Sequence, residues 1–384
     1  MTPFDVCEFV NLRRDLHAHP ELGLEEHRTS AIVAERLAAL GWRVTTGIGK
    51  TGVVGTLTAG SSRRAIGIRA DMDALPIHET TGLAYASRNV GRMHACGHDG
   101  HTATLLAAAA RLAASRAFDG TVHLIFQPAE ENVGGGQMMV EDGLFDRFPC
   151  DAIFAMHNYP GVPLGHFGFR AGPIMAAVDE ATIIVQGQGG HGADPHEAID
   201  PIVAGASIVM ALQTIISRNR DPIDPGVITV GAFQSGQASN VIPDTARLVL
   251  SIRSFDPDLR DQLEARIKAL VAAQAASFGA SATVDYLRSY PATINHADET
   301  AFARSVAVAH AGDDKVYDLR KPSMGSEDFS YMLEKRPGSY FTLGAGDAPG
   351  WKSLHHPSYD FNDDLIAIGS GYWQALAERF LAPA

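Results

Sequence analysis

The chain has 384 residues, of which 46% are hydrophobic and 20% charged, a composition that is typical of folded globular proteins and excludes extended disorder. Its 31 Lys and Arg residues against 44 Asp and Glu residues give a net charge of −13, which argues against a nucleic acid or an anionic membrane as partner. At about 150 residues per domain, this length predicts two or three domains.

The sequence contains no pattern typical of a membrane span or a secretion signal. The longest apolar stretch, residues 103–110, is too short to cross a bilayer. Residues 1–14 contain Asp5 and Glu8 and lack the apolar core of a signal peptide. Three cysteines, an odd number, cannot form a disulfide framework and fit a reducing compartment. We therefore expect a soluble, cytoplasmic protein.

In the first part of the chain, predicted strands alternate with helices. Residues 7–40 predict a helix that is broken at His19-Pro20 and ended by Gly41. An Ala/Leu-rich helix is predicted at 101–114. Short apolar or β-type runs, typical of buried strands, lie at 53–57, 65–70, 121–126 and 152–156. This alternation predicts an α/β domain with a mixed sheet covered by helices.

The middle of the chain follows a different order of elements. Strands are predicted at 179–186, 227–233, 245–253 and 282–287, with helices at 199–217 and 259–278. The resulting order β-α-β-β-α-β is that of a ferredoxin-like unit. We therefore expect residues 179–288 to form a domain inserted into an α/β domain made of residues 1–178 and 289–384, whose last helices lie near 299–311 and 365–380.

The densest cluster of chemically active side chains is M-H-A-C-G-H-D-G-H at residues 93–101. A helix would place its three histidines on one face, but Gly97 and Gly100 argue against a helix there. In an extended or looped backbone, Cys96 and His98 point to the same side and can bind one metal ion. Imidazole and thiolate suit zinc and related first-row metals, and carboxylates extend the choice to manganese. The alternative is a glycine-rich turn with incidental histidines.

Two adjacent acids, Glu130 and Glu131, directly follow a predicted buried strand. Adjacent carboxylates repel each other unless a cation or a proton intervenes, so one can bind a metal while the other takes a proton from water. The alternative is two solvated acids in a loop. His157 ends the next strand, and a histidine pair lies at 355–356. Enough ligands for two metals would come from Cys96, His98, Glu131, His157 and one histidine of that pair.

Two glycine-rich segments match nucleotide-binding patterns but lack the context that such sites need. Residues 47–52, G-I-G-K-T-G, lead into a β-type run, so no helix N-terminus is available for a phosphate. Residues 187–192 follow a predicted strand, but the positions about 20 residues further on hold no acid for a ribose. We therefore expect no nucleotide site.

Taken with their order along the chain, these motifs resemble the M20 metallopeptidases, in particular the branch of N-acyl-amino-acid amidohydrolases that includes hippurate hydrolases and auxin-conjugate hydrolases. The resemblance covers essentially the whole chain. It rests on D-L-H-A-H-P-E at 15–21, R-A-D-M-D-A-L at 69–75, M-H-A-C-G-H-D at 93–99, Q-P-A-E-E at 127–131, G-H at 190–191, N-V-I-P at 240–243, G-S-E-D-F at 325–329 and L-H at 354–355. Asp71 and Cys96 depart from the ligand types of the wider superfamily.

The resemblance implies a role for named residues of this chain. It implies that Glu130 is the general base and that Asp73 is an acid that orients a ligand. The implied metal ligands are Cys96, His98, Glu131, His157 and His355, for two divalent ions per subunit drawn from Zn, Mn, Co or Ni. On the inserted domain, His191 and Asn240 are implied to help bind the scissile carbonyl. Arg253 is a candidate for the substrate carboxylate, which a guanidinium fork suits.

The expected activity is metal-assisted hydrolysis of a hippurate-like N-acyl amino acid into a carboxylic acid and an amino acid. Glu130 would take a proton from the attacking water and deliver it to the leaving amine, while the metal and His191 stabilise the oxyanion. Alternatives are a dipeptidase or aminoacylase of the same superfamily, and a non-catalytic metal- or peptide-binding protein. In this family the inserted domain mediates dimerisation, so we expect a homodimer or dimer-based oligomer, with His191 acting in its own or the partner subunit.

Overall fold

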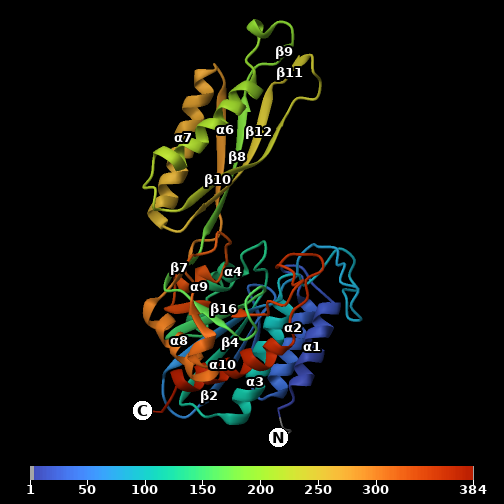
Figure 1. The fold of residues 1–384 in the computed structure, drawn as a ribbon, viewed down its shortest axis with the longest axis vertical. Helices are drawn as coiled ribbons and strands as arrows, with labels where there is room; N and C mark the ends of the chain where they lie inside the picture. The colour runs from blue at the N-terminus through green and yellow to red at the C-terminus, as the bar shows by residue number, and fades with distance from the viewer. Residues whose placement is uncertain (1–3, 384) are drawn as a thin grey trace. The chain divides into compact units, whose positions relative to one another are not determined.

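The chain forms two compact units. The computed structural model describes residues 4–383, so residues 1–3 and 384, which the expected domain ranges include, lie outside the described residues. Unit 1 comprises Met1–Ile174, Ile294–Lys321 and Asp328–Ala384, and unit 2 comprises Met175–Thr293 and Pro322–Glu327. The chain leaves unit 1 through β7 (Gly172–Met175) and returns to it through β14 (Thr293–Asn295). Figure 1 shows the two units and labels many of their helices and strands.

Unit 1 is built on an eight-stranded sheet with the strand order β1-β2-β4-β3-β5-β16-β6-β15. The strands are β1 (Arg43–Ile48), β2 (Gly52–Ala59), β3 (Ala65–Asp71), β4 (Gly120–Gln127), β5 (Ala152–Tyr159), β6 (Phe167–Phe169), β15 (Val316–Asp318) and β16 (Gly338–Gly344). β3 runs parallel to β4 and β5, whereas β2 runs antiparallel to β4. The predicted mixed α/β sheet is therefore confirmed, and β3 and β16 are buried along their whole length.

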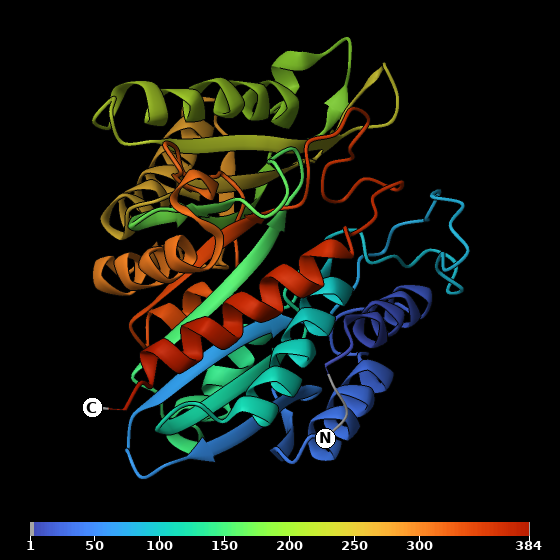
Figure 2. The same ribbon diagram turned by 60° about the horizontal axis from the view of Figure 1, so that its bottom comes forward.

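Unit 1 also contains helices, several of which pack against this sheet. They are α1 (Val6–Ala18), α2 (His27–Ala39), α3 (His98–Ser115), α4 (Gly135–Glu141), α5 (Leu144–Arg147), α8 (Ala297–Ala311), α9 (Ser330–Leu333) and α10 (Asp364–Phe380). The predicted break at His19-Pro20 is confirmed, since α1 ends at Ala18 and α2 begins at His27. α3 and α10 lie side by side over the sheet (Figure 2), and α1 also packs against α3.

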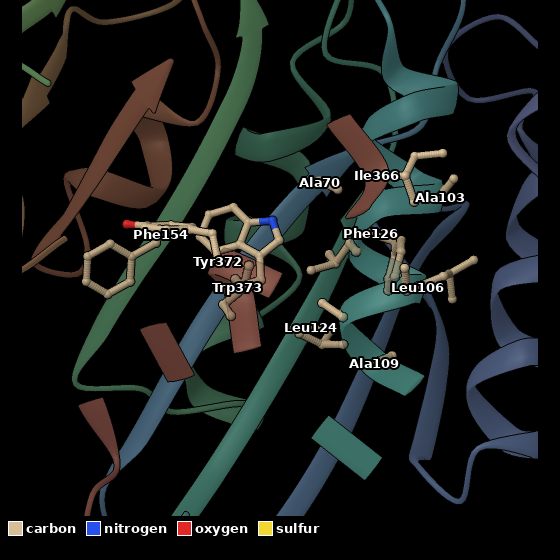
Figure 3. Packing of buried hydrophobic residues seen from close by; sticks show 14 of the residues in the cluster. Ala70, Ala103, Leu106, Ala109, Leu124, Phe126, Phe154, Ile366, Tyr372 and Trp373 are labelled. Carbon is tan, nitrogen blue, oxygen red and sulfur yellow. The ribbon is translucent and has the colours of Figure 1, made fainter. Parts of the chain in front are cut away.

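The core of unit 1 lies between α3, α10 and the central strands. Ala103, Leu106 and Ala109 of α3 are buried, together with Phe126 of β4 and Trp373 of α10 (Figure 3). Alanines on α3 leave room for the large side chains of α10 and the sheet, which is how interiors reach close packing. The first turn of α3 is therefore held firmly, and this turn carries His98.

One expectation about the start of α3 was only partly right, since residues 93–97 are not helical, as expected, but the helix begins before residue 101. The helix begins at His98, so Gly100 and His101 are helical. Gly97 precedes the helix with φ 99°, a left-handed conformation that glycine adopts without strain. Gly100 is tolerated in the helix because a Cβ there would lie 2.3 Å from the Phe361 ring. Packing against that ring, which the sequence pattern does not reveal, outweighs the low helix propensity of glycine.

Unit 2 contains a four-stranded antiparallel sheet with the strand order β10-β12-β8-β13. Its strands are β8 (Ala177–Gln186), β10 (Gly226–Ser235), β12 (Thr245–Ser254) and β13 (Ser281–Arg288), and a separate short pair is formed by β9 (Gly190–His191) and β11 (Val241–Ile242). Helices α6 (Pro201–Arg218) and α7 (Pro257–Ser277) pack against each other and against the sheet. Their buried contacts include Ile208, Leu212, Leu263 and Ile267.

Helix α6 is unusually apolar. Among residues 4–383 it is the one helix that is long and apolar enough, by length and composition alone, to cross a membrane. Its inner side belongs to the core of unit 2, but Ile202, Val203 and Met210 are exposed. Phe233 on the neighbouring edge strand β10 is exposed as well.

Candidate metal centre and active site

Polar side chains gather where the central strands of unit 1 end. Asp71 is the last residue of β3, the pair Glu130 and Glu131 follows β4, and His157 lies near the end of β5. Because these three strands are parallel, their carboxyl ends meet at one edge of the sheet. His98, at the start of α3, reaches the same edge.

The five expected metal ligands lie together at this edge. Cys96 Sγ is 3.4 Å from His157 Nε2. Glu131 Oε1 is 3.8 Å from His98 Nε2 and 3.4 Å from His355 Nε2. The ligand atoms of Cys96, His98 and His157 all lie within 4.8 Å of one another, and so do those of Cys96, Glu131 and His355. Cys96 therefore belongs to two adjacent groups of three possible ligands.

Of the two C-terminal histidines, it is His355 that joins these groups. Its backbone N–H donates to the Ala95 carbonyl at 2.8 Å, which holds it beside the loop that carries Cys96. Its φ of 65° is left-handed, a conformation that is uncommon for residues other than glycine. His356 instead accepts a hydrogen bond from the backbone N–H of Ser358 through Nδ1.

The orientation of the histidines fits a bound cation. His98 Nδ1 donates to Asp73 Oδ1 at 3.1 Å, and His157 Nδ1 donates to the Asn158 carbonyl at 2.8 Å. Both Nε2 atoms thus face the ligand groups, as in metal sites where a partner fixes the ring. His98 Nε2 and Glu131 Oε1 are buried without a hydrogen-bond partner in the described part of the chain. Such atoms are costly unless an ion satisfies them, and thiolate, imidazole and carboxylate suit a divalent first-row metal.

The charges of the site also fit a cation. Burial favours neutral His98, but the carboxylates of Asp71 and Asp73 outweigh it and raise its pKa to about 10. Burial, together with Glu131 and Glu130, raises the pKa of the Cys96 thiol well above its usual range. Burial and the nearby carboxylates thus favour the protonated form of Cys96, and the carboxylates favour that of His98. A divalent ion bound there would replace those protons, because it favours the thiolate and the free imidazole lone pair.

Asp73 and Glu130 lie next to the expected ligands. Asp73 accepts from His98 through Oδ1 and from the backbone N–H of Glu131 through Oδ2, at 3.0 Å. It thereby orients two of the expected ligands at once. Glu130 is buried, and its carboxylate lies within 4.8 Å of the ligand atoms of His98 and Glu131.

A chain of buried polar residues that sequence analysis gave no role supports the site from behind. His101 Nδ1 donates to Asp71 Oδ1 at 2.6 Å, and its Nε2 contacts Asn158 Oδ1 at 2.5 Å. Asn158 in turn donates to the Tyr359 hydroxyl at 2.6 Å. A Cβ on Gly97 would lie 2.7 Å from Asn158 Oδ1, so glycine is needed there for close packing. The position of His101 within the 93–101 motif was the available signal.

A second buried cluster anchors α1 to the first turn of α3. Asp99 Oδ2 accepts a hydrogen bond from His17 Nδ1 at 2.8 Å and pairs with Arg13 Nε at 3.2 Å. Although burial opposes it, hydrogen bonds to Asp99 and Glu79 raise the pKa of His17 to about 9. His94, also buried, has no hydrogen-bond partner for either ring nitrogen within residues 4–383, and burial lowers its pKa to about 4.

The three residues expected to bind substrate lie in unit 2. His191 pairs with Val241 across β9 and β11, and the Gly192 N–H donates to the Asn240 carbonyl at 2.8 Å, so His191 and Asn240 are neighbours. His191 Nδ1 accepts from the Ala193 N–H at 3.1 Å, which leaves Nε2 as a donor on a side chain that is 65% exposed. Arg253, on β12, donates through Nη1 to the Met324 carbonyl at 3.1 Å.

Comparison with known proteins identifies the class. Residues 67–379 match the model of Peptidase family M20/M25/M40, and the chain belongs to this family. It is 42% identical to the hippurate hydrolase of Campylobacter jejuni, over 97% of each chain. It is 39% identical to the N-acetyl-L-cysteine deacetylase of Bacillus subtilis, over 97% of this chain and 88% of that one. The Bacillus subtilis YXEP protein, a dinuclear metal-binding peptidase from the M20 family, superposes with a TM-score of 0.85 at 33% identity, over 98% of both chains. The resemblance drawn from the motifs is thus confirmed.

Proposed function

We propose that this protein hydrolyses the amide bond of N-acyl amino acids of the hippurate type in a metal-dependent reaction, releasing a carboxylic acid and an amino acid. The observation that carries this proposal is a set of thiol, imidazole and carboxylate groups, of which Cys96, His98 and His157 are buried, with a further buried carboxylate, Glu130, beside it. Two similar proteins are named for N-acyl amino acid substrates, hippurate and N-acetyl-L-cysteine, which supports the substrate class.

The same ligand groups would hold two cations, and Cys96 belongs to both groups. One would be held by Cys96, His98 and His157, and the other by Cys96, Glu131 and His355. The donor set suits Zn, Mn, Co or Ni. When bound, such ions polarise the amide carbonyl and acidify water.

Residues of the chain transfer the proton and bind the substrate. Glu130 accepts a proton as the water oxygen bonds to the carbonyl carbon, and it gives that proton to the amide nitrogen as the C–N bond breaks. Glu131 is unsuited to this role because its Oε1 faces His98 and His355. His191 and Asn240 bind the developing oxyanion, and Arg253 binds the α-carboxylate of the substrate.

A substrate panel tests this function against the alternative of a dipeptidase, which the description of YXEP as a peptidase favours. The metal-reconstituted protein is assayed with N-benzoylglycine, N-acetylcysteine and unblocked dipeptides. We expect kcat/KM to be highest for the N-acyl amino acids. Preference for dipeptides would indicate a dipeptidase, and metal binding without hydrolysis of any compound would indicate a binding protein.

Cys96→Ser is expected to weaken metal binding and to make activity depend on added cation, because a hydroxyl is a poorer ligand than a thiolate. The loss of affinity should exceed the roughly 10–100-fold that removal of an orienting partner costs. Elemental analysis and metal titration measure it. Matched controls are Cys7→Ser, at an exposed position, and Cys150→Ser, at a buried one, and both should bind metal normally. Wild-type affinity in Cys96→Ser would contradict the assignment.

We further propose that unit 2 is the ferredoxin-like insertion and that it joins two subunits. Its strand order and two helices agree with such a unit. The exposed Ile202, Val203 and Met210 on α6, beside the open edge of β10, form an apolar surface suited to a second copy. We place this homodimer in the cytoplasm, with small-molecule substrates and no nucleic-acid or membrane partner.

A further inference from the structure

The loop that carries Glu130 has an unusual backbone. Ala129, directly before Glu130, has φ 50°, in the left-handed region that a residue with a Cβ rarely adopts. Ala129 is also fully buried. A conformation of this kind persists only where the surroundings hold it in place. The direction in which Glu130 points therefore depends on whatever fixes the peptide of Ala129.

A buried acid from a distant part of the chain contacts that peptide. Glu26 Oε1 accepts a hydrogen bond from the Ala129 N–H at 2.8 Å, and Glu26 Oε2 accepts one from the Thr51 hydroxyl at 2.6 Å. The Glu26 side chain is 0% exposed. Glu26 is also the N-cap residue of α2, but its side chain makes no capping hydrogen bond. The carboxylate is thus used for the loop and not for the helix.

Close packing reinforces this contact. A Cβ on Gly23 would lie 3.0 Å from Ala129 Cβ and 3.1 Å from Ala129 Cα. On the other side, the Gly135 N–H donates to the Ala129 carbonyl at 3.0 Å. The peptide of Ala129 is therefore held by a hydrogen bond at each end and by contact with Gly23 at its side chain.

We propose that Glu26 is a positioning residue for the general base: its carboxylate fixes the left-handed Ala129 and so holds Glu130 at the distance from the substrate that proton transfer needs. This inference rests on the proposed role of Glu130. A hydrogen bond to a carboxylate is shorter and stronger than one to a neutral acceptor, which suits a strained backbone. The Glu26 carboxylate contacts Ala129 and Thr51, and Glu26 is not one of the expected ligands.

The first test compares Glu26→Leu, which removes the acceptor, with Glu26→Gln, whose amide oxygen can still accept from Ala129. We expect kcat of Glu26→Leu to fall by 10- to 10²-fold, since misplacing a reacting group by about 1 Å costs on the order of 10²-fold. KM and metal content should stay within twofold of wild type, and Glu26→Gln should recover most of kcat. The control is Glu25→Leu. Glu25 is the exposed neighbour of Glu26, and within residues 4–383 its one ion pair is with Arg92.

Hydrogen–deuterium exchange of a peptide spanning residues 127–133 gives a readout that needs no substrate. Exchange of this loop should accelerate in Glu26→Leu and stay at the wild-type rate in Glu26→Gln and Glu25→Leu. An independent variant, Gly23→Ala, pushes on Ala129 from the other side and should lower kcat with metal retained. Its control is Gly231→Ala in unit 2, where a Cβ would come no closer than 3.9 Å to any other group.

The outcomes separate this inference from the proposed function. Wild-type kcat and loop exchange in Glu26→Leu would overturn the positioning role, and so would a kcat loss that merely follows a loss of metal. If Glu26→Leu does not fold, the other two variants decide. The positioning role would be overturned if Gly23→Ala keeps the kcat of the wild type, or if Glu26→Gln is as impaired as Glu130→Gln. If the wild type hydrolyses none of the N-acyl amino acids, the proposed function fails, and the exchange data alone decide whether Glu26 holds the loop.

Discussion

Glu130→Gln is expected to lower kcat by roughly 10²–10⁴-fold, the contribution of a general base, while metal content stays close to that of the wild type. Glutamine matches glutamate in shape but cannot accept a proton at neutral pH. Glu130 lies within the buried site, and it is Glu131 that faces His355 and His98. Removing the charge of Glu130 should therefore stop proton transfer and leave the expected ligands in place.

The control for this variant is Glu131→Gln. It should lose metal as well as activity, because Glu131 is expected to bind the ion. Rates from steady-state assays and metal from elemental analysis separate the two variants. If Glu130→Gln keeps the kcat of the wild type, or if both variants lose metal equally, the division of roles between the two acids is wrong.

His191→Ala is expected to lower kcat by about 10²–10³-fold, the loss typical of one oxyanion donor. Its Nδ1 is engaged by the Ala193 N–H, so the exposed Nε2–H is the group available to a substrate oxygen. Metal content should be normal, because His191 belongs to unit 2 whereas all five expected ligands belong to unit 1. Normal kcat would assign the histidine to the surface of its loop.

Mixing two inactive variants tests whether this donor comes from the partner subunit. If it does, heterodimers of His191→Ala and Glu130→Gln should regain activity, because one site then combines an intact Glu130 with an intact His191. Subunit exchange is verified first by tagging one variant. Heterodimers that remain inactive would show that His191 acts within its own chain or has no role.

Local sequence pattern was sufficient to predict the strands that read as continuous apolar runs. The apolar runs at 65–70 and 121–126 are confirmed as β3 and β4. β16 was missed, although it lies between β5 and β6 in the sheet and is fully buried. Because β16 is buried at every position, its residues do not alternate between apolar and polar. It begins and ends with a glycine, and its sheet neighbours β5 and β6 come from the first half of the chain. No local pattern therefore marks it as a strand. β6 and β15 are three residues long, too short for any periodicity.

Candidate ligands could be proposed from the sequence because metal chemistry restricts which residue types serve. Apart from Asp73, which the family resemblance implied, the residues that support them could not be proposed, because a supporting residue is defined by its partner. His101 gains its role from Asp71, 30 positions earlier, and Asn158 from Tyr359, 201 positions later. Glu26 reaches Ala129 across 103 positions. The start of α3 at His98 likewise depends on contact with Phe361. Spacing along the sequence carries no information about such contacts.

The central claim, metal-dependent hydrolysis of an N-acyl amino acid, is tested most directly by one assay with N-benzoylglycine. The protein is stripped of metal with a chelator, and then Zn, Mn, Co or Ni is added back singly. We expect the stripped protein to be inactive, and at least one ion to restore the release of benzoate and glycine in equal amounts. Hydrolysis that persists unchanged in the stripped protein would contradict the claim, as would reconstituted, metal-loaded protein that leaves N-benzoylglycine intact.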